Sequence, residues 1–140
     1  MTHRSNSEIV LDVLDAVEAR DVERLGALYH PEIEFNWPPS LPYGGTHRGA
    51  DVSTMSYRFA GVWAPLQPTE AERRMDPIVV AASGDDVIVR YTWKGRDSAG
   101  RSIAADTLAH YEVRDGKLAR ARMYHYDLTG LLDFLSAAKP

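Results

Sequence analysis

The stretch RSIAADTLAHYEVRDGKLARARMYHYD, residues 101–127, decides the expected fold because it contains two long strands joined by a tight turn. The turn is Asp115-Gly116, a dipeptide favoured in two-residue hairpins, and strand-forming residues flank it on both sides. A regular pairing about this turn predicts three cross-strand pairs: Val113 with Leu118, His110 with Ala121, and Asp106 with His125.

One face of this hairpin is expected to gather titratable side chains among small and apolar ones. Side chains alternate across a strand, so the regular register assigns the following residues to one face: Asp106, Leu108, His110, Ala121, Met123, His125 and Asp127. Two acids and two imidazoles in such surroundings predict the wall of a pocket. Tyr124 falls on the opposite face, and a single bulge in either strand exchanges some of these assignments.

The composition is typical of one soluble globular domain spanning residues 1–140. With 44% hydrophobic and 26% charged residues, wholesale disorder is not expected. The net charge of -4 argues against nucleic acid as the main partner, because phosphate binding needs a cationic surface. The absence of cysteine excludes disulfides and thiolate chemistry and is compatible with the cytoplasmic location that we expect. We predict neither a signal peptide nor a membrane-spanning segment.

The rest of the chain predicts helices first and strands afterwards. Capping patterns and apolar spacing predict these elements: a helix opened by Ser5 and Glu8, a helix from Asp21 to Pro31, a strand at 32–37, a Pro- and Gly-rich loop at 38–49, a helix at 50–63, strands at 72–82 and 87–96, and a helix at 128–137 after the hairpin. This order predicts an α+β fold with N-terminal helices packed on a curved antiparallel sheet. The interior of such a cone is a natural small-molecule pocket.

Several short strings occur in a characteristic order along the chain. They are Asp21 to Leu25 with Leu28-Tyr29, Pro42 to Thr46 with Gly49, Asp115 to Leu118, and Tyr124 to Asp127 followed by Leu131-Leu132. Together they resemble the SnoaL-like (polyketide-cyclase-like) family of the NTF2-like superfamily, over about Glu8 to Leu135. The resemblance implies a cone-shaped NTF2-like fold, a hydrophobic small-molecule substrate, no cofactor, and a homodimer.

The same superfamily includes ketosteroid isomerase and limonene-epoxide hydrolase, whose catalytic sets do not carry over intact. The carboxylate of the isomerase falls at Trp37, and its tyrosine donor falls near a valine, which disfavours that mechanism. The epoxide hydrolases have an arginine two residues before the acid that matches Asp106, where this chain has Ala104. Aromatic-polyketide cyclases use a pocket aspartate and histidine for proton transfer, and the nearest matches are Asp127 and His110.

Four residues form the candidate catalytic set: His110, Asp106, Asp127 and His125. His110 is either a neutral core histidine or a general acid or base. Asp106 is either one half of a cross-strand ion pair or a carboxylate that orients an imidazole, and Asp127 either caps the closing helix or takes part in catalysis. No two histidines have the spacing of metal ligands on a helix, so no metal site is predicted.

Aromatic residues along the chain predict either the walls of the pocket or ordinary core packing. The candidate substrate-binding residues are Tyr29, Trp37, Tyr43, Tyr57, Trp63, Trp93, Met123 and Tyr124. The loop at 38–49 is either a lid that Tyr43 closes over a ligand or a wide connection before the next helix.

These features predict a cofactor-independent acid/base enzyme that acts on a hydrophobic oxygenated small molecule, as a cyclase, isomerase or dehydratase of polyketide or other secondary metabolism. Two alternatives remain. One is a non-catalytic small-molecule-binding or interaction domain of the same fold. The other is an epoxide or lactone hydrolase, which needs Asp106 and Asp127 on opposite sides of one cavity.

Overall fold

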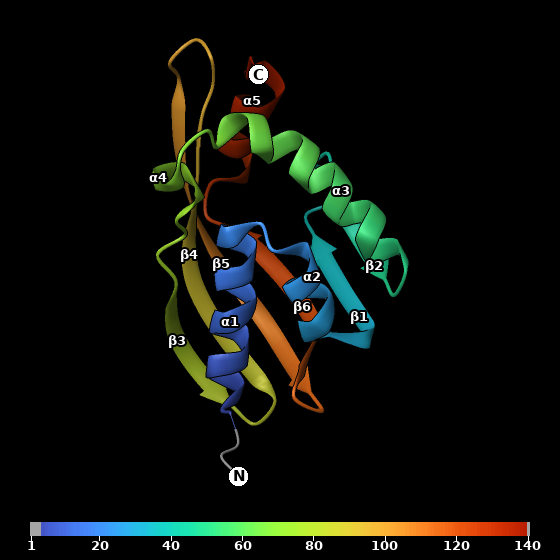
Figure 1. The fold of residues 1–140 in the computed structure, drawn as a ribbon. Coiled ribbons are helices and arrows are strands. Elements are labelled where there is room, and N and C mark those ends of the chain that lie inside the picture. Colours follow the sequence, from blue (N-terminus) through green and yellow to red (C-terminus); the bar gives the residue numbers. More distant parts are fainter. Residues whose placement is uncertain (1–3, 140) are drawn as a thin grey trace.

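The computed structural model describes residues 4–139, which form an α+β fold (Figure 1). Its helices are α1 (Asn6–Ala19), α2 (Val22–Leu28), α3 (Asp51–Trp63), the 3-10 helix η1 (Ala64–Leu66), α4 (Glu70–Arg73) and α5 (Leu128–Ala137). Its strands are β1 (Tyr29–Trp37), β2 (Gly45–Arg48), β3 (Ile78–Ser83), β4 (Asp86–Arg96), β5 (Ser102–Arg114) and β6 (Lys117–His125).

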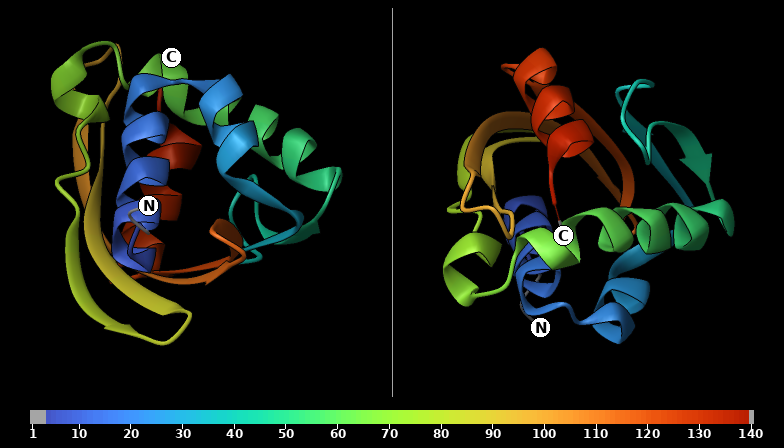
Figure 2. Two further views of the ribbon diagram at one scale, coloured as in Figure 1. Left: turned by 60° about the horizontal axis from the view of Figure 1, so that its bottom comes forward. Right: turned by 90° about the horizontal axis from the view of Figure 1, so that it is seen from above.

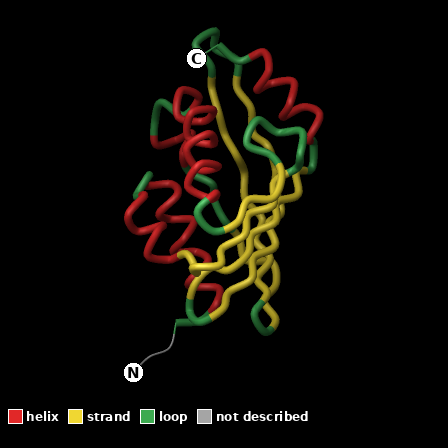
Figure 3. The backbone as a smooth tube through the Cα atoms, turned by 90° about the vertical axis from the view of Figure 1, so that its right-hand side faces the viewer, coloured by secondary structure: helices red, strands yellow, loops and turns green. Residues whose placement is uncertain are grey.

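The strands form one six-stranded sheet in the order β2-β1-β6-β5-β4-β3. Every neighbouring pair is antiparallel except β1 and β6, which run parallel, so the sheet is mixed. The sheet curves around an interior that α1, α2 and α3 close (Figure 2), and a side view shows α1 and α2 packed against one of its faces (Figure 3). The predicted architecture of helices packed on a curved sheet is therefore confirmed, but the sheet is mixed and not antiparallel throughout, because β1 lies parallel to β6.

Local capping explains where the first helices begin. Ser5 accepts a hydrogen bond from the Glu8 amide at 3.1 Å, and the Glu8 carboxylate accepts one from the Ser5 amide at 3.3 Å, as the sequence predicts. Asp21 accepts from the Arg24 amide at 3.1 Å and caps α2 in the same way. These bonds satisfy amide groups that a helix N-terminus otherwise leaves without partners.

Three predicted boundaries are wrong. The predicted strand at 72–82 begins only at Ile78, because Thr69 and Glu72 form a capping box that opens α4 instead. The strand predicted at 32–37 begins earlier, at Tyr29. The predicted loop at 38–49 contains β2, which extends the sheet by pairing with the end of β1.

The β5–β6 hairpin has the predicted turn but a different register. Asp115 and Gly116 both have positive φ angles, of 54° and 73°, as a type I′ turn requires, and Val113 pairs with Leu118 as predicted. Ala119 is an extra residue on β6, so that Glu112 pairs with Arg120. The further pairs predicted from a regular register are wrong, because the structure pairs His110 with Arg122 and Thr107 with His125.

This bulge changes which side chains share a face. The residues of the hairpin that face the interior are Thr107, Ala109, Tyr111, Ala121, Met123 and His125. Asp106, Leu108 and His110 lie on the outer face of the sheet, together with Tyr124. The predicted face that combines Asp106 and His110 with Met123 and His125 is therefore wrong, because one extra residue reverses the alternation beyond it.

Tyr43 is part of the core. Its side chain and that of Trp63 are fully buried, and the Trp63 indole donates a hydrogen bond to the Tyr43 hydroxyl at 3.0 Å. The ring of Tyr43 also meets Trp37 edge-on, with centroids 4.9 Å apart. The idea of Tyr43 as a lid residue therefore does not fit its position, because the ring anchors the 38–49 segment to α3.

Replacing Tyr43 by Phe should destabilise the fold, because the buried indole N–H of Trp63 then loses its acceptor. A buried donor without a partner costs about 1–3 kcal/mol, and we expect the free energy of unfolding in guanidinium chloride to fall by that amount. Tyr57→Phe is the matched control, since Tyr57 is 85% exposed, and should change the value by less than about 0.5 kcal/mol. Equal values for both variants would contradict the prediction.

Candidate functional site

An apolar cavity of about 210 Å³ lies between the helices and the sheet. Its walls are formed by side chains of α1, α2, α3, β1, β4, β5 and β6. Aromatic and long aliphatic residues dominate these walls, among them Leu14, Phe35, Trp37, Phe59, Trp93 and Met123. Such a cavity favours the body of a hydrophobic ligand, because binding removes apolar surface from water on both sides.

Three tyrosines bring hydroxyl groups into this apolar environment. Tyr29, Tyr91 and Tyr111 all line the cavity, and the Tyr111 hydroxyl donates a hydrogen bond to the Tyr91 hydroxyl at 3.4 Å. Burial raises the pKa of each phenol, to about 12 for Tyr111 and further for the other two, where a neighbouring phenol adds to the effect. At neutral pH all three are therefore protonated hydrogen-bond donors.

The indole of Trp93 adds a further donor. Trp93 is only 3% exposed and lines the cavity. Its Nε1 atom makes no hydrogen bond of normal geometry, and it lies near the Tyr91 hydroxyl, whose ionised form it would stabilise. Buried polar atoms normally have partners, so an unpaired donor on a cavity wall indicates where an acceptor atom of a ligand can bind. Within residues 4–139, no carboxylate and no imidazole lines this cavity.

The cavity opens between the α1–α2 corner and α3. Among its lining residues, Val22 and Ala60 are exposed, and Arg20 and Ser56 are partly buried. Val22 is 79% exposed, which places this end of the cavity at the protein surface. Tyr91, Tyr111 and Trp93 are buried on the sheet, so these donors lie deeper than Arg20, which is at the mouth beside Val22.

His125 is the predicted catalytic residue that lies nearest to this cavity. Its ring stacks on Trp37, which lines the cavity, with centroids 6.3 Å apart and planes at 9°. Nδ1 lies 3.0 Å from the Thr107 hydroxyl, whereas Nε2 is buried without a partner. Burial lowers the pKa of the imidazole to about 4, so the ring is neutral at pH 7.

Two tautomers of this histidine are compatible with its contact to Thr107. The Thr107 hydroxyl lies 3.0 Å from Nδ1 of His125 and 3.3 Å from the Ala105 carbonyl oxygen. When the hydroxyl donates to the carbonyl oxygen, it accepts from Nδ1–H, and Nε2 carries a lone pair. A neutral imidazole in that tautomer, with a free, buried lone pair, is suited to act as a base.

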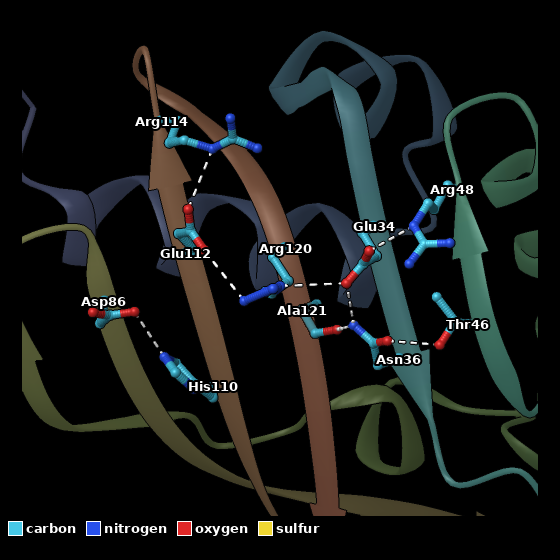
Figure 4. Close-up of polar contacts among 10 residues, drawn as sticks. All are labelled: Glu34, Asn36, Thr46, Arg48, Asp86, His110, Glu112, Arg114, Arg120 and Ala121. Atoms are coloured by element: carbon cyan, nitrogen blue, oxygen red, sulfur yellow. Dashed lines mark hydrogen bonds and ion pairs between the residues drawn. The ribbon is translucent and has the colours of Figure 1, made fainter.

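His110 and Asp106 lie outside the cavity, on the outer face of the sheet. His110 Nε2 lies 2.8 Å from an Asp86 carboxylate oxygen (Figure 4), and Asp106 accepts a hydrogen bond from the Thr92 hydroxyl at 3.2 Å. The structure therefore does not bring these two residues together with His125, and each has a surface partner instead.

The outer face also carries a network of ion pairs (Figure 4). Glu34 accepts hydrogen bonds from Arg48 at 2.7 Å and from Arg120 at 3.3 Å, and Arg120 also lies 3.6 Å from Glu112. Hydrogen bonds from Asn36 and Arg48 lower the pKa of Glu34. These charged side chains pair with one another across β2, β1, β6 and β5. They therefore help to hold the strands together, and each of them already has a partner.

Asp127 is the N-cap of α5. Its carboxylate accepts a hydrogen bond from the Gly130 amide at 2.9 Å. Of the two roles expected for Asp127, capping the closing helix or catalysis, the structure shows the capping role. Asp106 and Asp127 line one surface groove beside β5 and α5, and both are exposed. The acid pair that a hydrolase needs therefore lies in open solvent rather than in the apolar cavity.

The predicted substrate-binding residues fall into three groups. Tyr29, Trp37, Trp93 and Met123 line the cavity, whereas Tyr43 and Trp63 are buried in the core beside it. Tyr57 is on the solvent side of α3, and Tyr124, 52% exposed, is on the outer face of the sheet.

Two cavity tyrosines were missing from that set, Tyr91 and Tyr111. Alternation along β4 places Tyr91 on the face of Trp93, so a signal for it exists in the sequence. Alternation with Val113 along β5 also turns Tyr111 inward, but the regular register grouped it with outward-facing residues of β6, so this signal was missed.

Across the described part of the chain, no group of three or more His, Cys, Asp or Glu side chains is arranged to hold a metal ion. None of the helices between residues 4 and 139 is long and apolar enough to cross a membrane.

Comparison with known families gives a match over most of the chain. The model of the SnoaL-like domain family matches residues 10–121. The chain belongs to the SnoaL-like domain family. This membership confirms the resemblance that the ordered strings indicate. None of the curated proteins compared with the chain matches it.

Solved structures place this SnoaL-like domain among NTF2-like folds. TerC, crystallised with polyporic acid, is 23% identical, with a TM-score of 0.79 over 94% of this chain and 98% of that chain. An NTF2-like protein of unknown function from Burkholderia pseudomallei is 20% identical, with a TM-score of 0.80 over 96% and 100%. IdmH from Streptomyces antibioticus, a proposed polyketide cyclase, is 17% identical, with a TM-score of 0.73 over 91% and 96%.

The buried environment of His125 should be visible in its titration. We expect the ring to gain its proton near pH 4 rather than near 6.5, as followed by NMR of the imidazole nitrogens and assigned with His125→Gln. Between these values the unfolded chain binds the proton and the folded chain does not, so the free energy of unfolding should fall as the pH is lowered through this window. A midpoint at the ordinary histidine value would contradict the assigned environment.

Proposed function

We propose that the protein is a cofactor-independent enzyme that acts on a hydrophobic, oxygenated small molecule, in a reaction of the cyclase, isomerase or dehydratase type. The observation that carries this proposal is the set of protonated phenols and the unpaired Trp93 N–H in a cavity that is otherwise apolar. An oxygen atom of a ligand is the natural partner of these donors. Two structural relatives support the substrate class, since TerC was crystallised with polyporic acid and IdmH is a proposed polyketide cyclase.

The phenols favour chemistry in which negative charge develops on a carbonyl oxygen. Removal of a proton next to a carbonyl group produces an enolate, whose oxygen accepts hydrogen bonds more strongly than the parent carbonyl does. The Tyr91 hydroxyl accepts a hydrogen bond from Tyr111, so its own proton is available to a ligand oxygen. This hydroxyl lies in a low-dielectric site, where its interaction with that oxygen is strengthened. It therefore stabilises the transition state of proton removal more than the bound substrate.

His125 is the base in this proposal. In the tautomer whose Nδ1–H donates to Thr107, its Nε2 atom carries a free lone pair, and the ring is stacked on Trp37 at the cavity wall. A base with a pKa of about 4 is weak, but ketosteroid isomerase removes a C–H proton with a carboxylate of pKa about 4.6 and a tyrosine donor. The proposal requires that the Trp37 indole moves aside when a ligand binds, because Trp37 and not His125 lines the empty cavity.

A small-molecule carrier of the same fold is the second candidate. The absence of any carboxylate or imidazole on the cavity wall, within the described residues 4–139, favours it. In that case the same phenols and the Trp93 N–H bind the oxygen atoms of a ligand but no proton is transferred. The two candidates differ in a measurable property, namely whether a bound ketone exchanges its acidic hydrogens.

We expect the enzyme to accelerate hydrogen–deuterium exchange next to the carbonyl of 2-tetralone in D₂O, followed by proton NMR. Tyr91→Phe should lower the catalysed rate about tenfold or more through loss of the donor whose proton is free, and His125→Gln should reduce it to background. Tyr124→Phe, on the outer face, is the matched control and should retain the parent rate. Binding of the ketone without accelerated exchange would support the carrier and contradict the enzyme.

We also propose that two copies pair through the outer face of the sheet. This face carries exposed apolar side chains, among them Leu108 at 44% and Tyr124 at 52%. Light scattering after size exclusion at micromolar concentration should give twice the chain mass of 15.6 kDa. Leu108→Lys should give the single mass, because pairing would bury a second cation beside Arg90, the cross-strand neighbour of residue 108. A monomer for the parent protein would contradict this proposal.

A further inference from the structure

Arg20 stands out because it is the charged side chain on the wall of the cavity. It follows the last residue of α1 and takes a left-handed backbone conformation, with φ of 59°, which turns the chain toward α2. The side chain is half-buried and lines the cavity near Val22 and Leu25, at the mouth. A guanidinium in an apolar wall is energetically unfavourable unless another group compensates it, because partial burial removes water from a permanent charge.

The position of this guanidinium is fixed by a neutral partner. The Gln67 amide nitrogen donates to the carbonyl oxygens of Lys94 at 2.9 Å and of Glu72 at 3.4 Å, so the amide oxygen faces Arg20. That oxygen accepts a hydrogen bond from Arg20 Nη2. Gln67 is itself buried, which makes it a rigid support. The support holds the guanidinium in place without neutralising its charge.

No counter-charge is supplied by the protein. Within residues 4–139, no carboxylate lies within ion-pair distance of Arg20, since Glu72 pairs with Arg96 at 3.1 Å and the Glu18 carboxylate accepts from the Met75 amide at 2.6 Å. Burial, followed by the positive charge of Arg73, lowers the pKa of Arg20. The positive charge of Arg20 at the mouth is therefore not paired with a carboxylate, and Arg73 adds to the positive potential there.

We infer that Arg20 binds an anionic group, a carboxylate or a phenolate, on the ligand of the cavity. This inference rests on the proposed function, because it assumes that the cavity binds a small molecule. A carboxylate matches the planar fork of the guanidinium, of which one nitrogen is held by Gln67 and the remaining N–H groups are available. The ligand then has three parts: an oxygen at the inner donors, a hydrophobic body along the walls, and a negative charge at the mouth.

The pair 2-naphthoate and methyl 2-naphthoate tests this charge preference. Both probes have the same two-ring body, and only the first is an anion. An enclosed cavity of about 150 Å³ holds benzene, so a cavity of about 210 Å³ that is open at one end suits two fused rings. Isothermal titration calorimetry gives the dissociation constant of each probe for the parent protein and its variants.

We expect Arg20→Gln to weaken binding of 2-naphthoate about tenfold, because a charge-assisted hydrogen bond is lost, and to leave the ester within about twofold. Retained binding of the ester also shows that the variant is folded. Arg20→Lys keeps the charge without the fork and should recover part of the loss. Lys117→Gln removes one positive charge at the exposed tip of the β5–β6 hairpin and should leave both constants unchanged.

The outcomes separate this inference from the proposal on which it rests. If the parent protein binds both probes and Arg20→Gln weakens neither, or weakens both equally, the anionic ligand is wrong while the binding cavity stands. If the parent protein binds neither probe, the binding cavity is contradicted, and the role of Arg20 fails with it.

Discussion

The bulge at Ala119 is the constraint on which the interior of this protein depends. One extra residue on β6 sets Tyr111 opposite Ala121 and Ala109 opposite Met123. Each large side chain thus meets a small one across the hairpin, which leaves space beside the sheet rather than a filled core. Without the bulge, the outward-facing residues of β5 would share a face with the inward-facing residues of β6, and no single face could be buried.

The same constraint explains why the fold was predictable and the catalytic set was not. The Asp115-Gly116 turn, the capping of α1 and the closing helix at Leu128–Ala137 follow from local rules, so the sequence predicts them correctly. The register of β5 against β6 instead depends on the single extra residue Ala119, and nothing about an alanine in a strand predicts a bulge. The adjacent apolar pair Leu118-Ala119, both buried, is the one break in alternation along β6 that could indicate the bulge.

The walls of the site were easier to predict than its polar groups. Trp37, Trp93 and Met123 face inward for reasons of hydrophobic alternation, which holds within each strand whatever its partner. The predicted roles of Asp106 and His110 depended on how two strands align, so an error of one residue moved both to the outer face. Arg20 could not be recognised from sequence, because its significance comes from Gln67 and from the absence of a nearby carboxylate in the described residues.

Burial at the cavity disfavours charge of either sign, which keeps His125 neutral and the phenols protonated. Burial lowers the pKa of His125 because an imidazolium there loses its hydration. In the proposed reaction, a proton transferred from a ligand to Nε2 creates that imidazolium and an oxyanion at the same time, and their mutual attraction offsets part of the cost of burying each. The rest must come from hydrogen bonds to the oxyanion by phenols that burial keeps protonated. The proposed proton removal therefore requires a ligand whose oxygen reaches those donors, so the aromatic walls that position the ligand would also select the reaction.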